Sequence, residues 1–282
     1  MITTVIGIGL IGGSLSLELR SRKISSKIIG VDINIENQAK ALSLNLVDEI
    51  GNIQEACKIS DLVIVAVPID KSENVLITVL DVIPDKTVVI DVGSTKKNIC
   101  QIAEKHPKRS QFVAAHPIAG TEFSGPESAH LGLFEDKVNI VCDPEKSDTA
   151  MLDKMIQLFS HLGMNTIYMN AGDHDKHIAY VSHISHISSF ALGLTVLEIE
   201  KNRENIYQMA GGGFESTVRL AKSSADMWTP IFVHNADNIL VALQAYIDNL
   251  NKFKRVIEGR KDEEINSLII QANKISKALK ET

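Results

Sequence analysis

Two polar side chains with proton-transfer chemistry, Ser94 and His116, each follow a short apolar run of the sequence. Ser94 follows Thr87–Val92, and His116 follows Gln111–Ala114. In an open α/β sheet, ligands bind outside the carboxyl ends of the strands. A lone histidine is more often structural than catalytic. At a strand end beside a cofactor crevice, however, His116 could take the proton of a carbinol whose hydride leaves for a nicotinamide.

A glycine-rich turn near the start of the chain has the pattern G-x-G-x-x-G, with Leu10 and Ile11 as its last two variable positions. Gly7 permits the tight turn, Gly9 lets the backbone approach a pyrophosphate, and Gly12 lets helix and strand pack closely. The free N–H groups at the start of the next helix then hold the phosphates. The motif alone is weak, because such turns also occur in sheets without a nucleotide. Its strand-turn-helix context predicts a dinucleotide site.

Asp32 strengthens this prediction and bears on the choice of cofactor. It ends the next β-branched run, where the carboxylate that binds the ribose belongs. A carboxylate accepts hydrogen bonds from a 2′-hydroxyl and repels a 2′-phosphate, and residues 33–35 include no Arg or Lys. We therefore expect NAD rather than NADP. Val67 and Pro68 are expected to line the adenine–ribose side of the crevice, although a simple loop start would also explain them.

The first half of the chain alternates β-branched runs with longer amphipathic segments. The expected strands are Thr3–Ile8, Lys27–Asp32, Leu62–Val67, Thr87–Val92, Gln111–Ala114 and Lys137–Cys142. The expected helices are Gly12–Arg22, Ile35–Asn45, Ser72–Ile83 and Thr149–Leu162, and a short run at Asn165–Met169 finishes this layer. Near-continuous Val and Ile suit strands buried on both faces, and the alternation predicts an α/β fold with a Rossmann-type doubly wound parallel sheet.

After about Gly172 the apolar residues recur at helical spacing. The segment Ala171–Glu200 is expected to form one long helix, interrupted in character only by Gly193. Two apolar stripes follow: Ile239, Leu240, Leu243, Ile247 and Leu250, then Ile265, Leu268, Ile269, Ala272 and Ile275. Such faces often pack against a second subunit, so we expect a homodimer. The domains expected are a NAD-binding one at 1–170 and an all-helical substrate-binding and dimerisation domain at 171–282.

Composition excludes several classes of partner. The 282 residues carry a formal net charge of −6, which argues against a nucleic-acid or anionic-membrane surface. The apolar runs are only strand-length, and the start, MITTVIGIG, lacks the basic region of a signal peptide. Cys57, Cys100 and Cys142 have no C-x-x-C spacing. They are expected to be reduced, buried thiols of a cytoplasmic protein.

The block from His116 to Glu122, HPIAGTE, together with Gly9–Ser14, resembles the prephenate/arogenate dehydrogenase family of tyrosine biosynthesis. The likeness continues, in the family's order, through Ser182–His186, Gly211–Phe214, Arg219 and Met227–Phe232. These motifs span nearly the whole chain, so the match is specific. Ile184-Ser185 departs from the family, where many members have Leu-Pro. The flanking histidines remain, and we expect little consequence.

The resemblance implies a role for each matching residue. His116 corresponds to the base that accepts the proton of the ring 4-hydroxyl of prephenate, and Ser94 to the partner that orients its imidazole and contacts the same hydroxyl. Arg219 corresponds to a residue that binds a substrate carboxylate, which suits a guanidinium fork. Three further positions match the lining or the mouth of the substrate pocket: His186, Thr121 and Glu122.

The implied reaction transfers hydride from C4 of prephenate to NAD while His116 removes the hydroxyl proton. Loss of the ring carboxylate as CO2 makes the ring aromatic and gives 4-hydroxyphenylpyruvate. Arogenate, which carries an amino group in place of the side-chain keto group, would give tyrosine instead. Aromatisation supplies the driving force, so no metal is expected. His116 must be neutral to act as a base, and activity should fall as the pH drops through its pKa.

Several residues also have simpler interpretations. Arg219 could form a surface ion pair with Glu215, Trp228 is expected in the core or at a domain interface, and Gly211–Gly213 could be only a loop. Four histidines have spacings that could bind a metal, but no completing ligands are evident. They are His174, His177, His183 and His186.

Two other functions stay open at this point. One is a Rossmann dehydrogenase of the β-hydroxyacid type, which typically uses a lysine of the helical domain, with Lys176 as a weak candidate. The other is a nucleotide sensor without catalysis. A sensor would need the glycine turn but not Ser94, His116 and Arg219 together.

Overall fold

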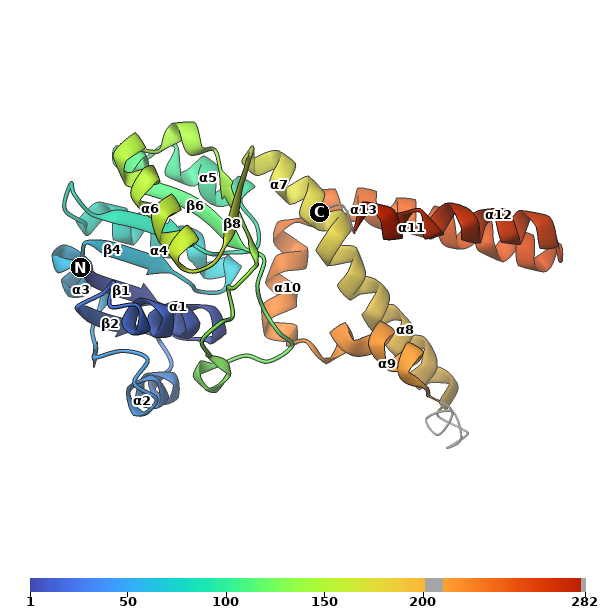
Figure 1. The fold of residues 1–282 in the computed structure, drawn as a ribbon, viewed down its shortest axis with the longest axis horizontal. Helices are drawn as coiled ribbons and strands as arrows, with labels where there is room; N and C mark the ends of the chain where they lie inside the picture. Colours follow the sequence, from blue (N-terminus) through green and yellow to red (C-terminus); the bar gives the residue numbers. More distant parts are fainter. Residues whose placement is uncertain (201–209, 280–282) are drawn as a thin grey trace.

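The computed structural model describes residues 1–200 and 210–279, which form one sheet followed by a set of helices (Figure 1). The strands lie in the order β3-β2-β1-β4-β5-β6-β7-β8. Their bounds are β1 Ile2–Ile6, β2 Lys27–Val31, β3 Glu49–Ile50, β4 Leu62–Val65, β5 Val88–Asp91, β6 Phe112–Pro117, β7 Val138–Cys142 and β8 Asn165–Met169. Strands β1 to β6 are parallel, so their carboxyl ends share one edge, where ligand sites are expected.

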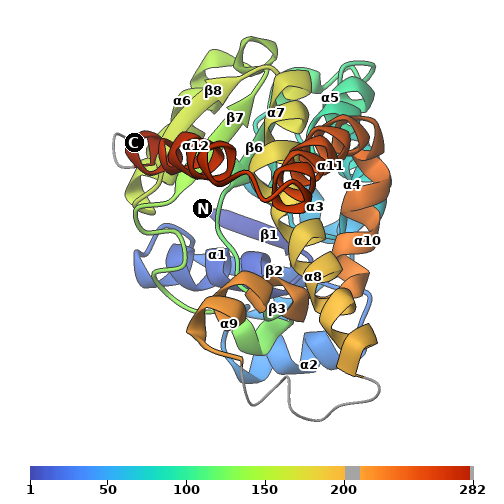
Figure 2. The same ribbon diagram turned by 90° about the vertical axis from the view of Figure 1, so that its right-hand side faces the viewer.

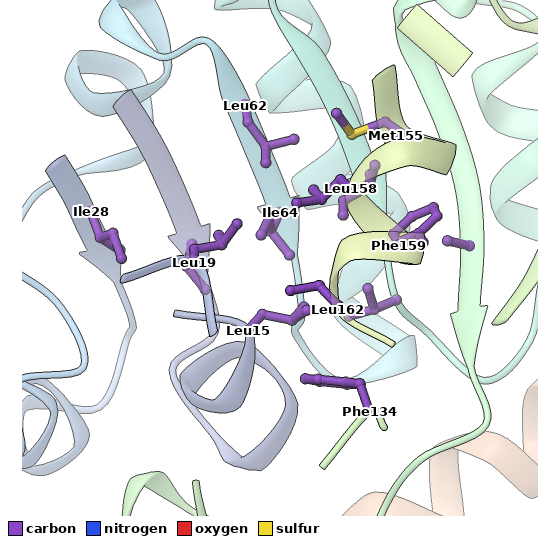
Figure 3. Close-up of a cluster of buried hydrophobic side chains, with 14 of the residues drawn as sticks. Leu15, Leu19, Ile28, Leu62, Ile64, Phe134, Met155, Leu158, Phe159 and Leu162 are labelled. Carbon is purple, nitrogen blue, oxygen red and sulfur yellow. The ribbon is translucent and has the colours of Figure 1, made fainter. Parts of the chain in front are cut away.

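Both faces of the sheet are buried because its strands are runs of consecutive apolar residues. Successive side chains point to opposite faces, so Ile64 lies in one core cluster and Val63 in the other. Figure 3 shows the cluster of Ile64, to which α1 contributes Leu15 and α6 contributes Phe159. The helices between the strands are α1 Leu10–Ser21, α2 Ile35–Ser43, α3 Ile53–Ile59, α4 Ile69–Val82, α5 Lys97–Ala103 and α6 Thr149–His161.

Strand β6 continues to Pro117, so His116 lies inside the strand and not, as the sequence pattern predicts, after its end. His116 pairs with Ile140 and Pro117 with Asn139 of β7. Strand β7 is antiparallel to β6, which also departs from the expected parallel sheet. The reason is the connection 118–137, which contains no α-helix and therefore supplies no crossover to a parallel neighbour.

The other expected elements of this half agree with the structure to within a few residues, and Asn165–Met169 is indeed a strand, β8. The sequence pattern does not predict three short elements, β3, α3 and α5. These elements have two, seven and seven residues. Segments of that length are too short to show a hydrophobic period.

The second half contains helices and no strand among its described residues, and it stands beside the sheet, with α11 and α12 extending away from it (Figures 1 and 2). Its helices are α7 Ala171–Ile178, α8 Ile184–Glu200, α9 Gly212–Val218, α10 Ala225–His234, α11 Ala236–Glu258, α12 Asp262–Asn273 and α13 Ile275–Ala278. The expected single helix 171–200 is interrupted, not at Gly193, but by a π-helical turn at Ala179–His183. Such turns are frequent at functional sites.

The domain ranges 1–170 and 171–282 stay a prediction, and residues 201–209 and 280–282 of the second range lie outside the described residues. Large apolar side chains on α8, α11 and α12 are exposed in the single chain, among them Leu197, Leu240, Leu250 and Ile270. These faces match the expected packing against a second copy. No described helix is long and apolar enough to cross a membrane. The three cysteines are free and buried.

Candidate active site

His116 is connected to two other side chains by short hydrogen bonds. Its Nδ1 lies 2.8 Å from Nε2 of His174, and Nδ1 of His174 lies 2.8 Å from Oδ1 of Asp175. The Asp175 carboxylate also accepts the backbone N–H groups of Lys96 and Lys97, at 2.7 and 2.9 Å. The three side chains, which we call the His–His–Asp triad, thus connect β6, the start of α5 and helix α7. From the sequence, His174 is a candidate only for metal binding, and no local pattern points to Asp175.

A fully buried ion pair contacts the backbone next to His116. The ammonium of Lys96 donates to the carboxylate of Asp91, and both side chains are almost completely inaccessible to water. Nζ of Lys96 also donates to the carbonyl oxygen of Ala115 at 2.7 Å. This contact fixes the backbone of the residue before His116. A buried cation of this kind also disfavours a second positive charge nearby.

The electrostatic surroundings keep the histidines neutral. Burial lowers the pKa of His116 well below its ordinary value, and the neighbouring His174 ring and Lys96 ammonium lower it further. Burial also lowers the pKa of His174, against the opposite effect of Asp175. Both rings are therefore uncharged near pH 7, and an uncharged imidazole is the form that accepts a proton.

Ser94 lies half-buried in the loop between β5 and α5. Within the described part of the chain, its hydroxyl makes no hydrogen bond to His116. Nδ1 of His116 is instead occupied by His174. Because His174 holds Nδ1, Ser94 has only the Nε2 side of the His116 ring left to act on, and its role in orienting the imidazole stays a prediction. A contact between Ser94 and the substrate stays a prediction.

The glycine turn joins β1 to α1 and has room for a ligand. Gly7 adopts φ 90°, and a Cβ there would lie 2.4 Å from the carbonyl oxygen of Ala66, so only glycine fits. A Cβ on Gly9 would meet no atom within 4 Å, which leaves open space beside the turn. A Cβ on Gly12 would lie 2.0 Å from the carbonyl oxygen of Gly7. Glycine at this position therefore allows the close packing of strand and helix. Leu10 and Ile11 begin α1.

The Asp32 carboxylate lies against the same turn. Its Oδ2 accepts the N–H of Ile8 at 3.0 Å, and its Oδ1 accepts the N–H of Asn34 at 2.9 Å. Each oxygen keeps a free lone pair, so the group can still accept ribose hydroxyls. Val67 follows β4 beside Gly7, whereas Pro68 is the N-cap residue that precedes α4 and is exposed. These residues fit a dinucleotide whose pyrophosphate lies at the start of α1.

On the helical side, aromatic rings pack next to the His–His–Asp triad. His186 stacks on Trp228 with ring centroids 3.5 Å apart. Trp228 packs with Ile69 of α4, so its expected place at a domain interface is confirmed. The amide of Asn235 donates to the carbonyl oxygen of Asp175 at 2.7 Å and lies 3.2 Å from Nδ1 of His183. Asn235 thereby connects the His183 ring to the triad residue Asp175.

Two buried N–H groups in this region have no acceptor among the described residues. Because Asn235 donates to Nδ1 of His183, the ring hydrogen of His183 lies on Nε2, which has no partner. Nε1 of Trp228, always a donor, has none either. Leaving a buried donor unpaired costs about 1–3 kcal/mol, so an acceptor beside either group would be stabilising. No signal in the sequence points to these two N–H groups beyond the place of His183 and Trp228 in the family motifs.

Arg219 meets the loop that follows β6. Its Nη1 lies 3.5 Å from Oε2 of Glu122, and no ion pair joins it to Glu215, the alternative partner. The Arg219 side chain is half-exposed, at 55%, so its guanidinium stays accessible to a ligand. Thr121 lies next to Glu122, and its hydroxyl accepts the N–H of Phe123 at 3.2 Å. The structure thus brings Glu122 and Arg219 together, while their binding roles stay predictions.

Metal-binding spacing among the histidines does not lead to a cluster in the described residues. No three His, Cys, Asp or Glu side chains there form a group that could hold a metal ion. His174 instead bonds to His116 and Asp175, and His177 is exposed.

Comparison with known proteins identifies the family. The model described as "Prephenate dehydrogenase, nucleotide-binding domain" matches residues 15–168, and that described as "Prephenate dehydrogenase, dimerization domain" matches residues 170–271. The chain belongs to the prephenate dehydrogenase family. The resemblance inferred from the motifs is therefore confirmed, as is the fold class of a Rossmann-type sheet followed by a helical domain.

Three similar proteins illustrate the range of this family. A prephenate dehydrogenase of Bacillus subtilis is 31% identical over 92% of this chain and 71% of its own length. The structure of prephenate dehydrogenase from Aquifex aeolicus in complex with hydroxyphenyl propionate and NAD+ has a TM-score of 0.90 at 29% identity, covering 99% of this chain and 98% of that one. A Synechocystis arogenate dehydrogenase structure has a TM-score of 0.76 at 25% identity, covering 99% and 100%.

The burial of His183 predicts how stability depends on pH. Burial lowers the pKa of His183 to about 4, while the unfolded chain takes up this proton near pH 6.5. Stability from this group is therefore present at pH 7 and is lost as the pH falls toward 4. In urea unfolding, the stability lost through His183→Gln should shrink by about 1–2 kcal/mol between pH 7 and pH 5.

The matched control is His177→Gln, which changes an exposed histidine of the preceding helix. Its difference from wild type should stay constant over the same pH range. A constant difference for His183→Gln as well would show that the His183 ring does not titrate abnormally.

Proposed function

We propose that this chain catalyses the oxidative decarboxylation of prephenate to 4-hydroxyphenylpyruvate, with hydride transfer to NAD, as a step of tyrosine biosynthesis. The observation that carries the proposal is a neutral, buried His116 at the same edge of the sheet as the glycine turn and Asp32. An unprotonated base and a dinucleotide cradle on one edge are the two parts that alcohol oxidation needs.

The reaction requires a base at the ring 4-hydroxyl. NAD supplies the acceptor for the hydride that leaves C4. As the C4–O bond becomes a carbonyl, Nε2 of His116 accepts the hydroxyl proton, because Nδ1 is already bonded to His174. The bond between the ring and its carboxylate then breaks, its electron pair enters the ring, and CO2 leaves. The ring oxygen, now a phenolate, takes the proton back from His116, so one NADH and one CO2 are formed per prephenate and no net proton is released.

The polar groups of the site fit a substrate with two carboxylates. Arg219 offers an accessible guanidinium, and the N–H groups of His183 and Trp228 are buried donors that lack acceptors in the described residues. Charge-assisted hydrogen bonds to such groups are about twice as strong as neutral ones. Asp32 without a neighbouring cation supports NAD rather than NADP, because a carboxylate repels a 2′-phosphate.

Arogenate is the second candidate substrate, and one contact favours it. Glu122 lies 3.5 Å from Arg219. If Arg219 binds the side-chain carboxylate, an acidic group lies where arogenate carries its ammonium group. The β-hydroxyacid alternative has less support, because Lys176 is exposed and the described residues give it no polar partner. A sensor without catalysis would have no use for a buried, neutral His116.

Turnover assays with purified protein test this function. Wild type should form NADH from prephenate with NAD, and with NADP the rate should be much lower. His116→Asn should lower kcat by roughly 10²–10⁴-fold, the usual contribution of a general base. The control His177→Asn removes an exposed imidazole of α7 and should leave the rate unchanged.

Folded wild type that oxidises neither prephenate nor arogenate would contradict the proposal. A higher kcat/KM for arogenate would move the assignment to the second candidate.

Arg219 is predicted to act on binding rather than on chemistry. Arg219→Ala should raise the KM for prephenate by about 10–100-fold, the equivalent of one lost hydrogen bond between charged groups, with kcat changed much less. Lys222→Ala, which removes an exposed cation from the same 3₁₀ turn, should leave KM unchanged. Equal effects of the two substitutions on KM would mean that only the general positive charge of this surface matters.

A further inference from the structure

The hydrogen bonds of the His–His–Asp triad determine where the ring hydrogens lie. The Asp175 carboxylate accepts three hydrogen bonds, two from backbone N–H groups and one from Nδ1 of His174. An ionised carboxylate only accepts hydrogen bonds, so Nδ1 of His174 must carry the hydrogen. A neutral imidazole has one hydrogen, and Nε2 of His174 is therefore left as an acceptor.

The same logic extends to His116. Its Nδ1 lies 2.8 Å from that acceptor, so Nδ1 must carry the hydrogen of His116. Nε2 of His116 is then the nitrogen with a free lone pair. We propose that Asp175 and His174 are positioning residues that fix the tautomer and orientation of His116, so that Nε2 is always presented as the base. This inference deepens the proposed function and rests on it for its catalytic meaning.

Burial explains why such a device is effective here. Both imidazoles are almost inaccessible to water, with His174 at 0% and His116 at 9% exposure. Without water, neither ring can find another partner for its Nδ1 hydrogen. Burial also lowers the pKa of His174, which keeps its Nε2 free to accept. When Nε2 of His116 takes a proton, the Nδ1 hydrogen remains bonded to His174, and the new charge is stabilised through that ring by Asp175.

The two nearest alternatives are excluded by geometry. Lys96 donates to Asp91 and to the carbonyl oxygen of Ala115, and it makes no hydrogen bond to either imidazole. Ser94 makes none to His116 among the described residues. The orientation of the base therefore depends on His174 alone at Nδ1.

The tautomers can be measured without substrate, by ¹⁵N NMR of histidine-labelled protein near pH 7. The His116 signals are assigned by their loss in His116→Gln. In wild type, Nδ1 of both His116 and His174 should have the shift of a nitrogen that carries hydrogen, and Nε2 that of a bare nitrogen. A hydrogen on Nε2 of His116 would overturn the proposal. Because no turnover is involved, this result does not depend on whether prephenate is the substrate.

Two substitutions of His174 separate positioning from mere packing. A glutamine amide reaches about as far as Nε2, so His174→Gln can give its NH2 to Asp175 and its oxygen to His116. An asparagine amide reaches only as far as Nδ1, so His174→Asn keeps the bond to Asp175 but loses the one to His116. We expect kcat to fall about 100-fold or more in His174→Asn and within about tenfold in His174→Gln, with KM nearly unchanged in both.

Asp143→Asn is the matched control. The Asp143 carboxylate accepts the N–H of Ala171 at the start of α7, the same helix, but lies outside the triad. The substitution Asp143→Asn should leave kcat unchanged. Equal kcat losses in His174→Gln and His174→Asn, or no loss in either folded variant, would overturn the positioning role. Wild type without turnover, but with the NMR pattern above, would instead count only against the proposed function.

Discussion

A carboxylate inside a protein must find donors for its oxygens, and at Asp175 these donors are the first N–H groups of α5 and the ring of His174. This requirement connects two parts of the molecule that are far apart in sequence. The sheet contributes the loop after β5 and strand β6, and the helical half contributes α7. Because the donors occupy Asp175, the hydrogen of His174 is fixed, and the free nitrogen of His116 follows from it. The tautomer of the base, His116, is thus a consequence of packing helix α7 against the sheet.

The sheet places the other residues of the site at one common edge. Parallel strands with both faces covered present their carboxyl ends at one edge, and the glycine turn, Asp32 and the loop with Ser94 all follow strands there. The π-helical turn at Ala179–His183 lies where the second half leaves this edge, and it ends at His183, which Asn235 connects to Asp175. The helical half therefore supplies both the residue that holds Nδ1 of His116 and the buried, unpaired N–H groups of His183 and Trp228.

Much of this could be predicted from the sequence, because the signals are local. Buried parallel strands need consecutive β-branched residues, and a pyrophosphate turn needs glycines at fixed spacing, so β1, α1 and Asp32 were found directly. The end of β6 was missed, since His116 and Pro117 are held in the strand by the antiparallel neighbour β7 and not by their own preference. The triad was also missed. His116 and His174 are 58 positions apart, and no local pattern records a contact over that separation.

The central claim is that a neutral His116 in the His–His–Asp triad is the base, and the pH dependence of kcat/KM tests it most directly. Rates would be measured for prephenate at saturating NAD between about pH 4 and pH 8. The account predicts a plateau at neutral pH and a loss of activity on the acid side. The inflection should lie below the ordinary histidine value of 6.5, because burial, His174 and Lys96 lower the pKa of His116. An inflection at or above 6.5, or no loss of activity across the acid range, would contradict the account.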